Sequence, residues 1–430
     1  MRDMVKVILQ LYPMLRAKDE EERGKLRPVG RNAERFQEFV AGLPYIAEAV
    51  DDLGLWGISS IEHHFHSEGY EVGPNPAIIA THLAGLTKRV RVGQLGFTMS
   101  AQSPLRVAED AALIDHLTRG RCFVGFSRGY QSRWTNILGQ HLGAKATLSP
   151  DGFSEARKAM LSDAQLKAEY ESDRANRDIF EEQVDMVLEA WTRDLINHYS
   201  ARWQIPFPYA EGIDWGMSEV TRHLGAEGEI GPDGRVHGVS VCPAPYTKPH
   251  PPVFVASNAS QQTIEYAGDK GFIPAYFSSI KTAARFGAAY VDHAAKAGRK
   301  YELGQNQALV RWTQIGPTTE AARRAIADYD VEIYKNLYQP LTPSMPFRVE
   351  DPVQSVLDSG LFSAGTVEEV RDDFVSQWKA LPAEYVVLIY HYSQMPKEAV
   401  VKNLEEFMGK VKPDLDELTD YGSGGRVDEP

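Results

Sequence analysis

Short apolar runs alternate with longer amphipathic stretches along most of the chain. A strand that is buried on both faces shows a continuous apolar run, whereas a surface helix shows apolar positions spaced three and four residues apart. The runs that predict strands lie at 5–11, 57–61, 90–97, 121–126, 251–256, 272–277, 307–315 and 385–390. Helices are predicted between them, so the order of elements indicates an α/β fold, a parallel (β/α)8 TIM barrel.

Local signals mark several helix ends within this pattern. Asn75 before Pro76 predicts a helix start, because asparagine caps the free N–H groups and proline fits the first turn. Thr366 and Glu369 have the spacing of a capping box, and Gly271 follows the last position of a predicted helix. The helical stretches are therefore separate elements.

The chain has 430 residues, whereas a barrel of this kind needs only about 250 without insertions. Long insertions are expected after strands four and seven, at about 130–177, 197–250 and 339–365. None of them has a core pattern of its own, so residues 1–413 are expected to form one domain. The end of the chain, 414–430, is rich in glycine and is predicted to be a mobile tail.

Composition narrows the class of protein further. The net charge of -13 disfavours binding to nucleic acid, because an acidic protein repels the phosphate backbone. The two cysteines, Cys122 and Cys242, form no pair motif, which is typical of a reducing compartment and predicts a cytoplasmic protein. The apolar run near the N-terminus is broken by Pro13 and is too short to span a membrane.

Titratable residues gather directly after the second predicted strand. Glu62, His63, His64, His66 and Glu68 lie where this strand ends, the side of a barrel at which active sites are found. A histidine there suits a general base or a hydrogen-bond donor near neutral pH. A metal site is disfavoured, because neighbouring residues on a strand point to opposite faces. A third interpretation is a set of satisfied polar residues at a strand end.

Two further strand ends carry residues suited to an anion. Ser127 and Arg128 follow the fourth strand, and an arginine there can hold a phosphate through two hydrogen bonds. Ser257, Asn258 and Ser260 follow the fifth strand at a predicted helix start, where free N–H groups favour negative charge. Taken singly, Arg128 could be a solvated turn residue and Ser260 an N-cap. On one face of a barrel the two features support each other.

The order of these motifs resembles that of the bacterial luciferase-like monooxygenases, a flavin-dependent barrel family. The motifs are Glu62-His63-His64-Phe65, Asn75-Pro76, TKRVRVG at 87–93, PLRVAED at 104–110, LID at 113–115 and GRCFVGFSRG at 120–129. The dense similarity covers 55–129, a looser one covers 249–271, and strand order alone supports the remainder.

The resemblance implies that reduced FMN binds at the C-terminal mouth of the barrel. His63 matches the catalytic histidine of the family, and we expect Glu62 or His64 to orient it. The family often has a non-proline cis peptide bond beneath the flavin ring, and the matching bond here is Leu95–Gly96.

The resemblance also assigns the phosphate of FMN to two places. Arg128 matches the phosphate-binding arginine, and the segment with Ser257, Asn258 and Ser260 matches a second phosphate loop. Ser127 stands where luciferase itself has a cysteine, so a small residue remains beside the flavin.

The activity implied is that of a two-component monooxygenase. A separate NAD(P)H-dependent flavin reductase would supply reduced FMN, and a peroxyflavin formed with O2 would oxygenate a small organic substrate. A homodimer is expected, paired through the helices that follow strands two and three.

Other activities fit the same barrel. One is a deazaflavin (F420)-dependent oxidoreductase that transfers hydride, another is a flavin-binding protein without turnover, and a third is a metal hydrolase. Aromatic residues at strand ends predict either an apolar substrate pocket or barrel core; they are Tyr12, Phe97, Tyr276, Phe277 and Trp312.

Overall fold

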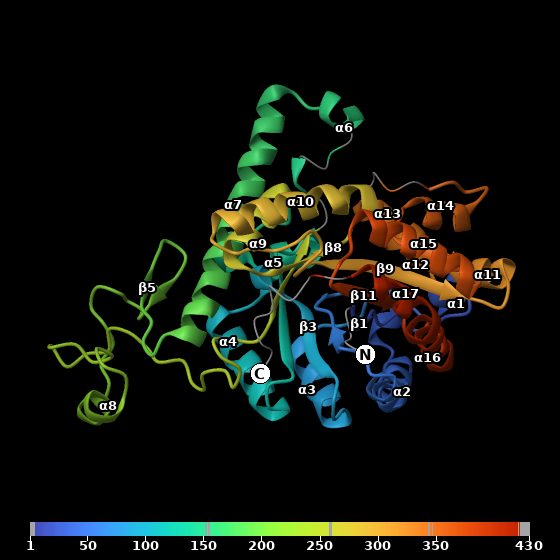
Figure 1. Cartoon of the computed structure of the whole chain (residues 1–430). Coiled ribbons are helices and arrows are strands. Elements are labelled where there is room, and N and C mark those ends of the chain that lie inside the picture. Colours follow the sequence, from blue (N-terminus) through green and yellow to red (C-terminus); the bar gives the residue numbers. More distant parts are fainter. Residues whose placement is uncertain are drawn as a thin grey trace.

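The chain folds into a closed barrel of eight parallel strands surrounded by helices (Figure 1). The computed structural model describes residues 5–150, 153, 155–257, 260–342, 345, 347–419 and 421. The barrel strands are β1 (Lys6–Leu11), β2 (Gly57–Ser60), β3 (Arg91–Thr98), β4 (Cys122–Ser127), β7 (Val253–Ser257), β8 (Ile273–Tyr276), β9 (Ala308–Ile315) and β11 (Tyr385–Tyr390). They pair in this order, and β11 pairs with β1 to close the barrel. The predicted fold class and all predicted strands are confirmed.

The main helices pack on the outside of the barrel, each following a strand. They are α2 (Ala33–Asp52), α3 (Pro76–Leu86), α4 (Pro104–Thr118), α7 (Asp163–Thr192), α9 (Gln261–Lys270), α10 (Ile280–Lys296), α11 (Thr319–Tyr329), α15 (Val367–Ala380) and α16 (Lys397–Glu406). The predicted caps are present. The side chain of Asn75 accepts a hydrogen bond from the backbone N–H of Ile78 at 2.9 Å, and Thr366 and Glu369 form the capping box.

Two apolar cores hold the barrel together. The outer core lies between strands and helices and includes Val92 and Ile46. The inner core fills the barrel, and at its N-terminal end aromatic rings pack against one another across the lumen. The ring centroids of Trp56 and Phe123 are 5.2 Å apart, and those of Phe123 and Phe254 are 5.5 Å apart. This end is therefore closed, so any site must lie at the opposite mouth.

A long insertion connects β4 to β7, as predicted. It begins with α5 (Ser132–Leu138) and α6 (Glu155–Ala159) and continues into α7, which rises beyond the barrel in Figure 1. Helix α7 starts at Asp163, within the expected insertion 130–177, because Ser162 and Gln165 form a capping box at its first turn. The first turns of α7 are largely exposed and polar, so hydrophobic periodicity alone does not mark them.

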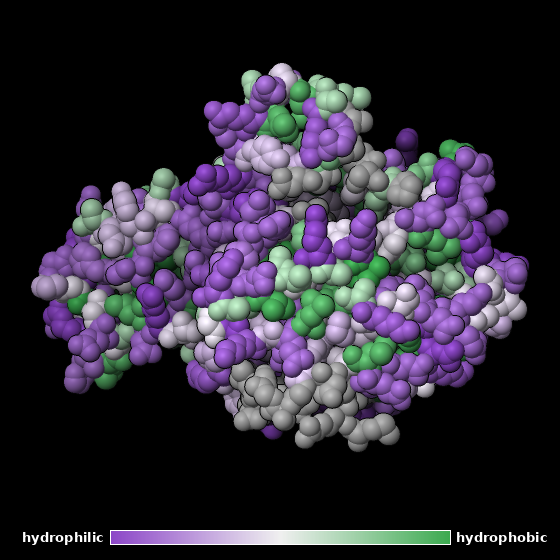
Figure 2. Space-filling model, turned by 45° about the horizontal axis from the view of Figure 1, so that its top comes forward, coloured by the Kyte–Doolittle hydropathy of each residue, from purple (hydrophilic) through white to green (hydrophobic). Residues whose placement is uncertain are grey.

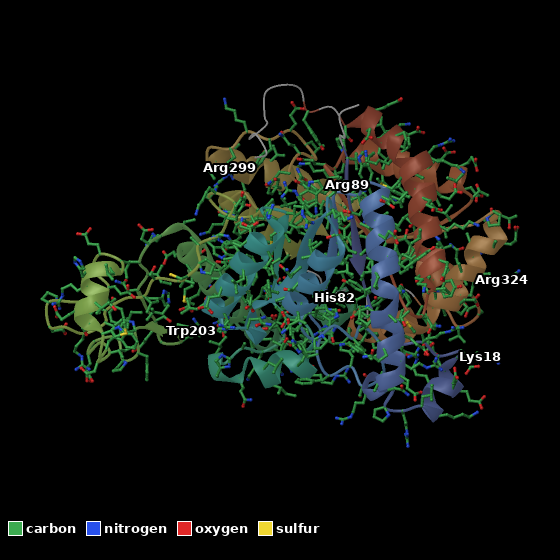
Figure 3. All side chains as sticks on the ribbon, turned by 90° about the horizontal axis from the view of Figure 1, so that it is seen from below. Lys18, His82, Arg89, Trp203, Arg299 and Arg324 are labelled. Atoms are coloured by element: carbon green, nitrogen blue, oxygen red, sulfur yellow. The ribbon has the colours of Figure 1, made fainter. Side chains whose placement is uncertain are left out.

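The second half of this insertion projects away from the barrel. It contains β5 (His198–Tyr199) paired antiparallel with β6 (Gln204–Ile205), and the short helix α8 (Ser218–Leu224). Figure 3 places Trp203 where this projection meets the body of the protein, and Trp203 packs there against the cluster of Leu142 and Ile179. The chain returns along α4, where Thr247 N–H donates to Asp115 at 2.7 Å.

The connection from β9 to β11 is more regular than predicted. Besides α11 it contains α12 (Val331–Ile333), a π-helical segment (Tyr334–Tyr338), α13 (Gln339–Leu341), α14 (Pro352–Asp358) and strand β10 (Phe362–Gly365). Strand β10 pairs with the end of β9, beyond the point where β8 stops. The sequence did not mark β10, because the strand is short and contains serine and glycine.

The pattern of apolar positions does not mark the polar segment 18–31, which contains helix α1 (Glu20–Lys25). The prediction of a mobile tail is wrong for its first part, because helix α17 (Lys412–Leu418) buries Leu415 and Thr419 is buried after it. Apart from residue 421, the chain beyond 419 lies outside the described residues.

The face shown in Figure 2 is mostly hydrophilic, with hydrophobic residues gathered in a band across its middle. In the described part of the chain, no helix is both long enough and apolar enough to cross a membrane.

Candidate active site

The C-terminal ends of the barrel strands meet at one mouth, because all eight strands are parallel. The loop after β2 carries the histidines. It folds back on itself, since the N–H of His63 donates to the carbonyl of Gly73 at 2.9 Å. Glu71 lies within this fold with a positive φ of 47°. This conformation is uncommon for a residue with a side chain, and it brings the Glu71 carboxylate back towards His63.

The partner of His63 is Glu71. Nδ1 of His63 lies 2.6 Å from Oε2 of Glu71, and the carboxylate is buried. Burial opposes the charged form of Glu71, but the neighbouring His63 outweighs it and the pKa of the carboxyl is lowered. Glu71 is therefore an anion inside the protein at neutral pH. The expectation that Glu62 or His64 orients His63 is wrong in this respect.

Glu62 and His64 form a second pair beside the first. Oε1 of Glu62 lies 2.8 Å from Nε2 of His64 and also accepts from the side chain of Gln102 at 2.7 Å. Its other oxygen accepts the backbone N–H of Thr98 at 2.7 Å. The Glu62 carboxylate thus ties the loop after β2 to the end of β3. The catalytic role assigned to this pair stays a prediction.

His66 is buried rather than free in the loop. Its Nε2 lies 2.8 Å from Oε1 of Gln131, and the same oxygen accepts the indole N–H of Trp134 at 3.1 Å. Desolvation, with the adjacent His63 adding to it, lowers the pKa of His66 to about 4. His66 is therefore neutral at pH 7. Its ring stacks on that of His63, with centroids 5.8 Å apart.

Aromatic side chains enclose Glu71 and His63. Burial and the nearby Glu71 raise the pKa of Tyr12, Tyr130 and Tyr338, so these phenols stay protonated. The ring of Tyr12 meets that of His63 edge to face, with centroids 6.1 Å apart. Sequence reasoning missed Glu71, Tyr130 and Tyr338. A glutamate inside the His-rich loop was the one available signal for Glu71.

An apolar cavity lies in the lumen next to these residues. It is lined by Gln10, Leu95, Gly96, Gly125, Phe126, Phe254, Ala256, Ala275, Phe277, Val310 and Val387. The Leu95–Gly96 peptide bond is cis, as predicted, and the side-chain amide of Gln10 donates to the Leu95 carbonyl. A Cβ at Gly96 would fall on the backbone of Gly125, so only glycine fits this wall of the cavity.

The strand-end aromatic residues divide between the inner and the outer core. Tyr12 and Trp312 lie at the mouth with ring centroids 6.1 Å apart, and Phe277 meets Trp312 at 6.4 Å. Phe97 and Tyr276 instead belong to the outer core between strands and helices. Tyr12 and Trp312 are themselves buried in the inner core, with Phe277 packed against it, so the core interpretation is confirmed and the substrate pocket stays a prediction.

Arg128 is held in a cluster of charges after β4. Its Nη1 donates to Asp173 on α7 at 3.0 Å, and Arg177, one turn further along α7, donates to the same carboxylate at 2.8 Å. Thr147 donates to Asp173 as well, at 3.0 Å. Two guanidinium groups share one buried carboxylate, so the cluster keeps one positive charge. An arginine has five N–H donors, so Arg128 retains several for an anion.

The remaining predicted cofactor residues are placed as follows. Ser127 hydrogen-bonds Thr98 across β3 and β4, with 3.1 Å between the hydroxyl oxygens. Ser260 is the N-cap of α9, accepting the N–H of Thr263 at 3.4 Å. Ser257 ends β7, but its side chain and the whole of Asn258 lie outside the described residues.

These features belong together in one class of protein, the (β/α)8 barrel enzymes that act at the carboxyl ends of their strands. The His63 loop after β2, the Leu95–Gly96 segment of β3 and the positively charged Arg128 cluster after β4 lie on neighbouring strands of one barrel. The apolar cavity is lined by the middle one of these strands.

Within that class, the chain belongs to the luciferase-like monooxygenase family, which it matches over residues 28–384. The beta chain of alkanal monooxygenase from Photorhabdus luminescens is 36% identical over 91 residues, 21% of this chain and 28% of that protein. The beta chain from Vibrio harveyi is 38% identical over 118 residues, 27% of this chain and 34% of that protein. The similarity thus spans about a third or less of these relatives' length.

Solved structures share the fold over almost the whole chain. The FMN complex of the oxygenating constituent of 3,6-diketocamphane monooxygenase, a type II Baeyer-Villiger monooxygenase from Pseudomonas putida, has a TM-score of 0.67. It is 16% identical, and the match covers 95% of this chain and 98% of that one. Long-chain alkane monooxygenase (LadA) has a TM-score of 0.60 at 14% identity, covering 100% and 94%.

Proposed function

We propose that this protein is the oxygenating component of a two-component flavin monooxygenase. It would use reduced FMN and O2 to oxygenate a small organic substrate, and a separate NAD(P)H-dependent flavin reductase would supply the reduced FMN. The observation that carries the proposal is that the His63–Glu71 pair follows β2, the Arg128 cluster follows β4, and the Leu95–Gly96 cavity wall lies on β3 between these two strands. Family membership supports it.

The residues present fit FMN by their chemistry. The Arg128–Asp173–Arg177 cluster carries the net positive charge that a phosphate needs, and it is half-buried. The cavity wall at Leu95, Gly96 and Gly125 is apolar, which suits a planar ring. The start of α9 at Ser260 offers backbone N–H groups.

Reduced FMN, when bound, supplies the two electrons by which one oxygen atom of O2 goes to the substrate and the other to water. His63 would hold or move a proton at Nε2, the ring nitrogen that does not face Glu71. Among the described residues, Nε2 of His63 has no hydrogen-bond partner, so it is available for this task. The buried aromatic residues around the mouth would exclude water.

The substrate class we propose is apolar or aromatic. Tyr12, Phe277 and Trp312 support this, because their rings line or border the mouth. The test is substrate depletion from a metabolite library with reduced FMN and 18O2, followed by mass spectrometry of the products. Incorporation of one 18O atom supports the proposal. Hydride transfer from a reduced deazaflavin without O2, or flavin binding without any product, would contradict it.

We also propose a homodimer that works in the cytoplasm. Exposed Ile78 on α3, with Leu113 and Leu117 on α4, supports pairing through this flank, because large apolar side chains in contact with water favour association. The unpaired cysteines support a reducing compartment.

A further inference from the structure

We propose that Glu71 is the positioning residue of this site: its carboxylate accepts the Nδ1 proton of His63, so that Nε2 is the atom that exchanges protons at the mouth. The inference rests on the proposed function for the role of His63. The residues that match the family motif do not include Glu71, and the expectation from the sequence was that Glu62 or His64 would do this work.

The first argument is the geometry of the pair. The 2.6 Å between His63 Nδ1 and Glu71 Oε2 is the distance of a charge-assisted contact, although the angle is outside that of a good hydrogen bond. Besides His63, the described side chains that act on the Glu71 carboxylate are those of His66 and Tyr338. A buried carboxylate needs donors, so a small rotation of the ring should complete the bond.

The second argument is the state of His66. The Gln131 oxygen beside it already accepts the indole N–H of Trp134, so it can only accept from His66 as well. The proton of the neutral His66 ring is therefore on Nε2, and its Nδ1, which is buried without a hydrogen-bond partner among the described residues, carries none. His66 cannot donate to Glu71, which leaves His63 as the histidine that does.

The third argument is the support behind Glu71. The hydroxyl of Tyr338 lies beside Glu71 and 2.8 Å from Nε2 of His391, whose Nδ1 lies 2.7 Å from the buried carboxylate of Asp330. Tyr338 sits in a π-helical turn, an element often found at functional sites. This chain holds the Tyr338 hydroxyl in place beside Glu71.

A metal ion is the competing explanation for the same atoms. One ligand atom each from His63, His66 and Glu71 lies within 4.8 Å of the others. However, ligand atoms on a tetrahedral zinc lie roughly 3.3 Å apart, since each is about 2.0–2.2 Å from the metal. The pair of His63 and Glu71 is closer than that, at 2.6 Å. Direct contact therefore accounts for the geometry better than an ion between them.

The test is 15N NMR of histidine-labelled full-length protein, without flavin or substrate, so that its result does not depend on the proposed activity. His63→Asn identifies the His63 resonances by their loss. In the wild type we expect Nδ1 of His63 to carry the proton. In Glu71→Gln, a large part of the His63 rings should change from the tautomer protonated at Nδ1 to the tautomer protonated at Nε2. Circular dichroism and thermal unfolding check that the variant folds.

Glu62→Gln is the matched control, because Glu62 is an equally buried carboxylate on the same loop but faces His64. It should change the His64 resonances and leave those of His63 as they are. A His63 tautomer that is unchanged in Glu71→Gln, or that changes equally in Glu62→Gln, would overturn the inference. So would stoichiometric zinc in the purified protein that is lost in His66→Gln. Anaerobic FMN titration, run separately, tests the proposed function alone.

Discussion

The Arg128 cluster gives the sharpest test of cofactor binding. We expect Arg128→Ala to weaken reduced FMN without unfolding the protein. Removal of one guanidinium does not leave Asp173 unpaired, because the carboxylate keeps its contacts with Arg177 at 2.8 Å and with Thr147 at 3.0 Å. The buried charge of Asp173 therefore stays compensated, and the substitution should lower the affinity for reduced FMN rather than the stability of the fold.

The magnitude follows from the kind of bond that is lost. A hydrogen bond to a charged group contributes about 1.5–3 kcal/mol. Because 1.4 kcal/mol is tenfold in affinity, the dissociation constant should rise about 10- to 150-fold. The side chain of Arg128 is only 17% exposed, so solvent screens this interaction less than it would at the surface. Arg128→Lys should recover part of the loss, since lysine keeps the charge but not the planar fork.

The assay is an anaerobic titration of reduced FMN followed by tryptophan fluorescence, with reduced riboflavin titrated in parallel. Riboflavin lacks the phosphate, so its affinity should be equal in wild type and Arg128→Ala. Arg133→Ala is the matched control, because Arg133 lies on the neighbouring helix α5 and pairs with the exposed Glu68. If Arg128→Ala weakens riboflavin as much as FMN, or weakens neither, the cluster does not hold the phosphate.

Three further predictions concern the barrel and its surface. Gly96→Ala should lower the free energy of unfolding, measured in urea, by about 1–3 kcal/mol, because the new Cβ meets the backbone of Gly125. Gly85→Ala is the control: Gly85 lies on α3 with open space around it, so this substitution should be neutral or stabilising. The pKa of His66 is about 4 in the folded protein and near 6.5 in the unfolded chain. As pH falls from 7, the unfolded chain therefore binds the proton first, which favours unfolding. The free energy of unfolding should fall by about 2 kcal/mol between pH 7 and pH 5. Urea unfolding at pH 7 and pH 5 measures this loss; His66→Gln should show less of it, and an equal loss in the variant would contradict the assignment. Light scattering should give a dimer mass for the wild type and a monomer for Leu117→Glu, whereas a wild-type monomer at micromolar concentration would refute the dimer.

Local sequence determined most of the barrel. The eight strands are apolar over several consecutive residues, and the caps at Asn75 and Thr366 depend on neighbours within three residues along the chain. Such signals act over one turn or one strand, so they can be recognised without knowing the fold. The order of motifs around His63 and Arg128 was also sufficient to identify the family that the comparison confirms. Strand β10 was not predicted from the sequence, because it is short and lacks a continuous apolar run.

Tertiary structure alone decided which polar groups meet. Arg128 meets Asp173 because α7 folds back over the end of β4, and Tyr338 meets His391 because the β9–β11 connection returns to the mouth. Glu71 lies eight residues after His63, yet their contact requires a loop that doubles back with a positive φ at Glu71. Arg128–Asp173 and Tyr338–His391 join elements far apart in the sequence, so only the folded barrel brings these groups together and removes the water that would otherwise solvate them.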